Sequence, residues 1–205
     1  MSRTFVGQLR QNPKLRSHLV LFFALGVGYM LIEIAFFQKL SPFIAQPQTA
    51  LTALLFSLLL GDGVGSVLTS LLSRGQRPAA AVLLLICVAG LVAILVFVFP
   101  QAFEIGIDPR LAAMLVVLPP VILMGCPFPL ALHGLNRDGL QSHTALLWGV
   151  NGVACVLGSA LAMIIGLSWV FSGALFLGAV IYLGVAALFA VFALSARGSL
   201  EIPRP

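Results

Sequence analysis

Apolar stretches of about twenty residues recur along the whole chain, and they restrict its fold more than any other feature. A helix of that length crosses the ~30 Å hydrocarbon core of a bilayer. The composition agrees, because 60% of the 205 residues are hydrophobic and only 8% are charged. A soluble domain of this length needs many more charged residues on its surface. We therefore predict an all-α fold, a polytopic bundle of membrane helices.

The apolar stretches predict six transmembrane helices between a polar N-terminal segment, residues 1–17, and a polar tail, residues 196–205. The first span carries no cleavage site, so we expect it to be retained. Only Leu167 and Ser168 separate the last two spans, which predicts a tight hairpin with Trp169 at the outer interface. The six spans are expected at residues 18–37, 49–72, 79–99, 111–134, 143–166 and 169–195.

The basic residues outside the spans predict the orientation. If the N-terminus is cytoplasmic, nine Lys and Arg residues lie on the inner side and two, Lys39 and Arg110, on the outer side. Cytoplasmic loops of membrane proteins carry such an excess, so both termini are expected in the cytoplasm. The net charge of +5 then faces anionic lipid head groups, and no nucleic-acid partner is expected. The nine inner residues are Arg3, Arg10, Lys14, Arg16, Arg74, Arg77, Arg137, Arg197 and Arg204.

The fourth span contains four prolines, Pro119 and Pro120 in its middle and Pro127 and Pro129 near its cytoplasmic end. Each proline removes one helical hydrogen bond and clashes with the preceding turn. Such breaks persist in membranes where neighbouring helices or a cavity satisfy the freed carbonyl groups. We expect a kinked or discontinuous helix inside the bundle, which either serves packing alone or shapes a cavity.

Two carboxylates, Glu33 and Asp62, fall within the first and second spans. An acidic residue at membrane depth costs about 2.5–3.5 kcal/mol on insertion scales, so it should be protonated, paired or facing water. Glu33 is expected nearer the outer surface and Asp62 nearer the inner surface, about 10 Å apart in depth. That distance is too long for direct contact, but water or a third residue could bridge them.

Helical spacing places polar and small residues on one face of three spans. In the second span, Asp62, Ser66 and Thr69 follow each other at i, i+4 and i+7, and Gly61 and Gly65 beside them permit close helix packing. We expect these faces to converge. The corresponding residues are Gly26, Tyr29 and Glu33 in the first span and Thr144, Trp148, Asn151, Cys155, Gly158 and Ala162 in the fifth.

Two interpretations of these faces stay open. In the structural one, small and polar residues hold the helices together and the carboxyl groups are neutral and hydrogen-bonded. In the functional one, Glu33, Asp62 and Asn151 line a proton or substrate path. No metal site or cofactor is expected, because the histidines and cysteines lack the spacing of paired ligands. These residues are His18, His133, His143, Cys87, Cys126 and Cys155.

Four strings, in the same order along the chain, resemble motifs of bacterial membrane proteins described as spermidine-synthase-like. The resemblance implies a membrane region loosely similar to half of a major-facilitator transporter, which that family joins to a soluble aminopropyltransferase-like or methyltransferase-like domain. It makes Glu33 and Asn151 family-type positions, whereas Asp62 departs from a small neutral residue. The strings are GYMLIEIAFFQKL at 28–40, LLGDGVGS at 59–66, MGCPFPL at 124–130 and WGVNGVACVLGS at 148–159.

Three functional hypotheses follow. The leading one is a non-catalytic integral membrane subunit of the bacterial inner membrane that anchors or assembles other membrane or soluble subunits. The second is a transporter-like half that works as a homodimer. The third is the membrane component of a split spermidine-synthase-like enzyme. No enzymatic activity is expected of the chain itself, because it contains no segment of the kind that binds S-adenosylmethionine.

Overall fold

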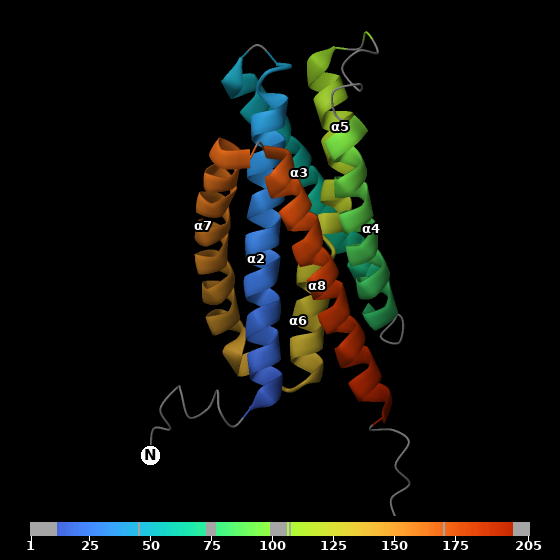
Figure 1. The fold of residues 1–205 in the computed structure, drawn as a ribbon. Helices are drawn as coiled ribbons and strands as arrows, with labels where there is room; N and C mark the ends of the chain where they lie inside the picture. Colours follow the sequence, from blue (N-terminus) through green and yellow to red (C-terminus); the bar gives the residue numbers. More distant parts are fainter. Residues whose placement is uncertain are drawn as a thin grey trace, which may run out of the picture.

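The protein is a bundle of helices. The computed structural model describes residues 12–44, 46–72, 77–98, 106, 108–169 and 171–198, and every regular element in these ranges is helical, which confirms the all-α prediction. The first turn of α2 and the last turn of α8 lie at the same end of the bundle (Figure 1). The elements are α2 (Pro13–Leu40), α3 (Pro47–Leu71), α4 (Arg77–Val98), α5 (Pro109–Met124), α6 (Pro127–Arg137), a short 3₁₀ helix η2 (Gln141–His143), α7 (Thr144–Trp169) and α8 (Phe171–Gly198).

The helices have the length and composition of membrane spans. Five segments of the described chain are long and apolar enough to cross a bilayer: Pro13–Leu40, Pro47–Leu71, Pro109–Arg137, Gln141–Ser168 and Phe171–Val191. The first of these is α2, and the third joins α5 to α6. Within α4, the described apolar stretch is shorter, Ala81–Val92. The structure thus confirms the prediction of a helical membrane bundle.

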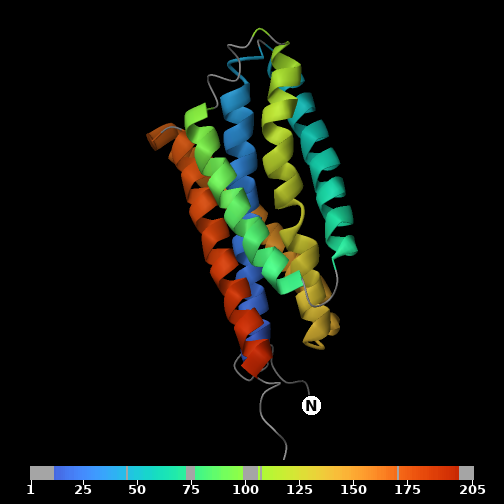
Figure 2. The same cartoon turned by 90° about the vertical axis from the view of Figure 1, so that its right-hand side faces the viewer.

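Helix α2 forms the centre of the bundle and packs against both α7 and α8. Around it, α4 pairs with α8 and α3 pairs with α5, as two views of the bundle show (Figures 1 and 2). In the most apolar window of each helix, 56% of the residues are buried in α2 but only 17% in α7. Helix α7 therefore exposes most of its apolar surface, which suits a helix that faces lipid. The fully buried side chains of α2 include Phe22, Leu31, Ile32, Ala35 and Phe36.

The end of α7 differs from the prediction. Helix α7 continues through Leu167 and Ser168 to Trp169, so the expected loop at 167–168 is wrong. Neither residue is a glycine or proline that would end a helix. The Phe171 ring, at the start of α8, fills the space that a side chain at Gly166 would need. The missing side chain at Gly166 therefore lets the start of α8 pack closely against the end of α7.

A polar cluster ties the start of α2 to the end of α6. His18, of which only 2% is exposed, donates from Nε2 to Oδ2 of Asp138 at 3.0 Å, and Lys14 Nζ lies 3.1 Å from Oδ1. Partial burial acts to raise the pKa of Asp138, but the hydrogen bonds from His18 and Lys14 outweigh it and hold that pKa below its usual range. The cluster therefore stabilises the contact between α2 and α6 while Asp138 is ionised.

We expect Asp138→Asn to lower the free energy of unfolding by about 1–3 kcal/mol, because it weakens hydrogen bonds to a charged group. Lys14→Ala is the control, and it should cost less than about 1 kcal/mol since the Lys14 side chain is 64% exposed. The contribution of Asp138 is fully present above its ordinary pKa of 3.8 and is lost as the pH falls through the lowered value. Unfolding in mixed SDS micelles at several pH values measures both effects. Equal losses in the two variants would contradict this assignment.

Candidate functional site

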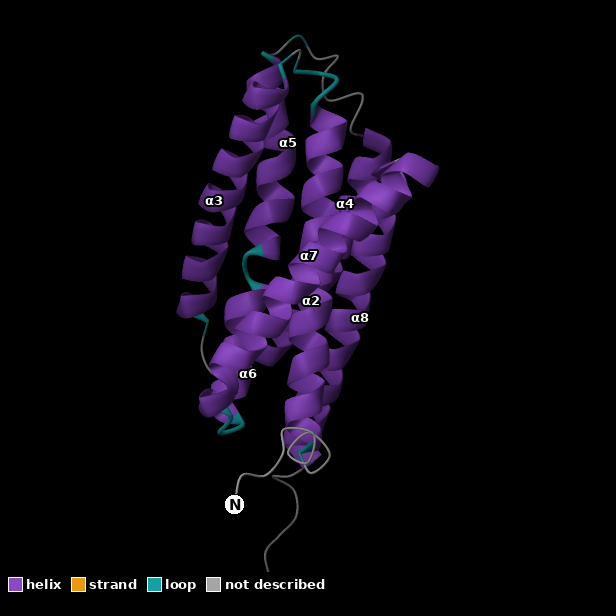
Figure 3. Cartoon of the chain, turned by 90° about the vertical axis from the view of Figure 1, so that its left-hand side faces the viewer, coloured by secondary structure: helices purple, strands orange, loops and turns teal. Residues whose placement is uncertain are grey.

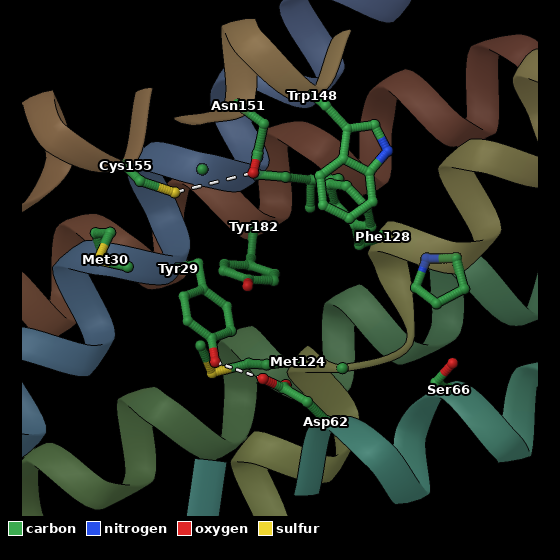
Figure 4. A pocket seen from close by; sticks show the side chains of 14 residues that line it. Tyr29, Met30, Asp62, Ser66, Met124, Phe128, Trp148, Asn151, Cys155 and Tyr182 are labelled. Carbon is green, nitrogen blue, oxygen red and sulfur yellow. Dashed lines mark hydrogen bonds between the residues drawn. The ribbon is translucent and has the colours of Figure 1, made fainter. Parts of the chain in front are cut away.

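A cavity of about 420 Å³ lies inside the bundle where α2, α3, α5, α6, α7 and α8 meet (Figure 4). Its volume is in the range of about 300–1,000 Å³ that small-molecule sites have. Two lining residues, Ser66 and Trp148, are exposed, so the cavity reaches the surface of the bundle. The polar and aromatic residues that line it are Tyr29, Asp62, Ser66, Phe128, Trp148, Asn151, Cys155 and Tyr182.

The cavity brings together part of the three faces that the sequence expected to converge. Asp62 and Ser66 line it from α3, and Asn151 lines it from α7. Thr69 is buried beside it, where its hydroxyl donates to the Ser66 carbonyl at 2.7 Å. Glu33 lies one turn beyond Tyr29 on α2, half-buried, and is not among the lining residues. Of the two intramembrane carboxylates, Asp62 therefore belongs to the cavity.

A hydrogen bond joins α2 to α3 at the cavity wall. The Tyr29 hydroxyl donates to Oδ2 of Asp62 at 2.6 Å, and Figure 4 shows the two side chains meeting there. The second carboxyl oxygen, Oδ1, is buried and has no hydrogen-bond partner in the described part of the chain. Sequence spacing placed Tyr29 on the correct face but gave no sign of this pairing, because it cannot align α2 with α3.

The fourth crossing is discontinuous beside this hydrogen bond. Helix α5 ends at Met124 and α6 begins at Pro127, so Gly125 and Cys126 form a short loop next to α3 (Figure 3). Pro119 and Pro120 lie within α5, which continues through both, and Pro127 and Pro129 lie in the first turn of α6. The interruption therefore falls at the second pair of prolines.

Cys126 satisfies carbonyl groups that the interruption frees. Its amide donates to the Leu123 carbonyl at 3.3 Å. In an uninterrupted helix residue 127 would donate to this carbonyl, but Pro127 has no N–H. Its thiol lies 3.4 Å from the Ile122 carbonyl and 3.4 Å from the Gly65 carbonyl of α3, as a weak donor. The sequence predicted only a small buried residue at this position. The role of Cys126 depends on carbonyl groups of two helices that meet there, and the sequence does not show this contact.

Glycines let α3 and the loop approach at backbone distance. A Cβ atom added to Gly125 would lie 2.6 Å from the Asp62 Cα atom, and one added to Gly61 would lie 2.7 Å from Val121 Cγ1. A Cβ atom at Gly65 would collide with the Ile122 carbonyl oxygen. These contacts fix Asp62 against the loop. The sequence predicted Gly61 and Gly65 as helix-packing residues. It did not predict Gly125, because the role of this glycine depends on the helix interruption.

The other two predicted packing residues lie on α7. A Cβ atom at Gly158 would lie 2.8 Å from the Val27 carbonyl oxygen, so α7 and α2 are in backbone contact there. Ala162, one turn further, is fully buried. Neither residue lines the cavity. They hold α7 against the central helix on the side where Asn151 projects.

An aromatic row and one amide form the wall of the cavity at α6 and α7. The Phe128 ring packs edge-to-face on Phe22, at 5.2 Å between centroids, and on Trp148, at 5.1 Å. The Asn151 amide donates to the Phe22 carbonyl at 2.9 Å, which leaves its side-chain oxygen 3.9 Å from the Cys155 thiol. The wall is therefore held in place by contacts to α2.

The chemistry of the lining residues suits binding. It includes one carboxylate, one amide, three hydroxyls and one thiol, and no Lys, Arg or His of the described ranges lines the cavity. In the described part of the chain no three His, Cys, Asp or Glu residues are grouped as a metal would require. Asp62 is the acidic residue among the described lining residues, and its carboxylate can bind a ligand more strongly than the neutral polar groups can.

No protein-family model, curated protein or solved structure matches the chain.

We expect Gly65→Ala to lower the free energy of unfolding by about 1–3 kcal/mol, because the added methyl group must separate α3 from the loop. Gly63→Ala is a matched control two residues away, where a Cβ atom meets nothing within 4 Å. It should leave stability unchanged or raise it slightly, because alanine favours the helix. SDS titration of both variants measures the difference, and equal stability of the two would argue against close packing at the loop.

Proposed function

We propose that the chain is a transporter-like membrane domain that binds a small solute in the cavity. The observation that carries the proposal is a cavity with an intramembrane carboxylate beside a discontinuous helix. Solute sites of membrane transporters are commonly built at such interrupted helices, which expose backbone groups only where they line a cavity. An ionisable residue inside a membrane also marks a solute or ion path more often than packing.

We further propose a homodimer in the bacterial inner membrane with cytoplasmic termini. The distribution of basic residues, nine inside and two outside, supports this orientation. The lining residues Ser66 of α3 and Trp148 of α7 are exposed, Trp148 at 56%, so a second copy seated over them would close the cavity. Such pairing corresponds to the two halves of a larger transporter.

The second candidate is the non-catalytic subunit that anchors partner proteins. The exposed apolar surface of α7 favours it, because a peripheral helix of this kind suits packing against another membrane subunit as well as lipid. In this case the bundle would be static. The two candidates therefore differ in whether the cavity opens to both sides of the membrane.

Cys155 lines the cavity and can report its access from each side. In a Cys87→Ala background, which removes the exposed thiol of α4, sealed right-side-out and inside-out vesicles are treated with 2-(trimethylammonium)ethyl methanethiosulfonate, and intact mass measures labelling. A transporter-like domain should be labelled in both vesicle types. Cys87→Ala/Cys155→Ala is the control for the buried Cys126 thiol. Labelling from one side only, or none, would contradict transport and favour the anchoring subunit.

A further inference from the structure

We infer that the cavity binds a small organic cation, with its ammonium group between Asp62 and the aromatic wall. This inference deepens the proposed function, because it names the class of solute for the same cavity. Three independent features support it: the charge balance of the lining, the polarity of the helix interruption and the arrangement of aromatic rings. Each concerns a different element of the site.

The charge balance of the cavity is negative. Asp62 is half-buried in an apolar bundle and has one hydrogen bond, from Tyr29, while its Oδ1 atom has no hydrogen-bond partner in the described part of the chain. An ionised carboxylate accepts several hydrogen bonds in water, and inside a membrane a partner of opposite charge stabilises it. Among the residues that the structure describes, no cationic side chain lines the cavity. A bound cation would supply the missing charge.

The backbone groups at the helix interruption also favour a cation over an anion. The amino-terminal end of a helix ordinarily attracts anions through its free N–H groups. Two of the first three residues of α6 are Pro127 and Pro129, which have no N–H, so this end offers few donors to an anion. Pro129 also leaves the Gly125 carbonyl without the amide donor of an uninterrupted helix. The Gly125 carbonyl, which follows the carboxyl end of α5, thus favours a positive ligand.

Aromatic rings surround the remaining space. Tyr29, Tyr182, Phe128 and Trp148 stand around the same opening in Figure 4. Aromatic faces attract ammonium groups, tryptophan most strongly, and quaternary ammonium ligands are recognised by cages of such rings. The rings come from α2, α6, α7 and α8, so a cation bound between them would contact side chains of four helices. The geometry therefore favours an alkylammonium over an inorganic ion.

Choline and its neutral isostere 3,3-dimethyl-1-butanol test the inference, because they share a shape and differ in charge. Titration calorimetry on the purified protein in nanodiscs should show saturable binding of choline, and binding of the isostere at least tenfold weaker. Asp62→Asn should weaken choline binding at least tenfold and leave the isostere unchanged. Ser70→Ala, on the exposed face of the same helix and outside the cavity lining, is the control and should change choline binding less than threefold.

If Asp62→Asn fails to fold, Trp148→Leu replaces it. The Trp148 side chain is 56% exposed, so its replacement removes little buried surface from the bundle. It should weaken choline more than the isostere. Equal binding of the two probes would overturn the organic cation while the cavity remained a solute site. Binding of neither probe would also overturn it, and labelling of Cys155 from both sides would then leave the proposed transport intact. Absence of both binding and labelling would contradict the two proposals together.

Discussion

The hydrogen bond between Tyr29 and Asp62 is the interaction on which the rest of the site depends. A carboxyl group inside an apolar bundle costs free energy unless another group satisfies it, and Tyr29 supplies this group at 2.6 Å. Helices α2 and α3 share few other contacts, since α3 packs mainly on α5. The bond therefore links α3 to the central helix across the cavity and keeps the space between them polar on one side.

The backbone of the interrupted helix imposes the second constraint. Prolines remove amide donors between α5 and α6, and the freed carbonyl groups need other partners within the membrane. Cys126 provides one through its thiol, and the absence of side chains at Gly65 and Gly125 brings α3 close enough to cover the loop. Asp62 projects from this same contact. The interruption thus positions the carboxylate as well as the aromatic wall that begins at Phe128.

The sequence was sufficient for the bundle and for part of the site. Apolar length predicted the helices, and helical spacing placed Asp62, Ser66 and Asn151 on converging faces. It could not pair Tyr29 with Asp62, because spacing within one helix says nothing of its alignment with another. Cys126 and Gly125 depend on where the helix breaks, and the close packing of α8 on the end of α7 depends on the contact of Phe171 with Gly166. These features arise from tertiary packing, which local patterns do not contain.

The most direct test of this account is a double-mutant cycle between Tyr29→Phe and Asp62→Ala, with the free energy of unfolding measured in mixed SDS micelles. If the hydrogen bond links α2 to α3 across the cavity, the double variant should lose less stability than the sum of the single variants. The expected coupling is about 0.6–1.7 kcal/mol, the range of hydrogen bonds between membrane helices. Losses that add to within about 0.3 kcal/mol would show that the two side chains act independently, and would contradict the account.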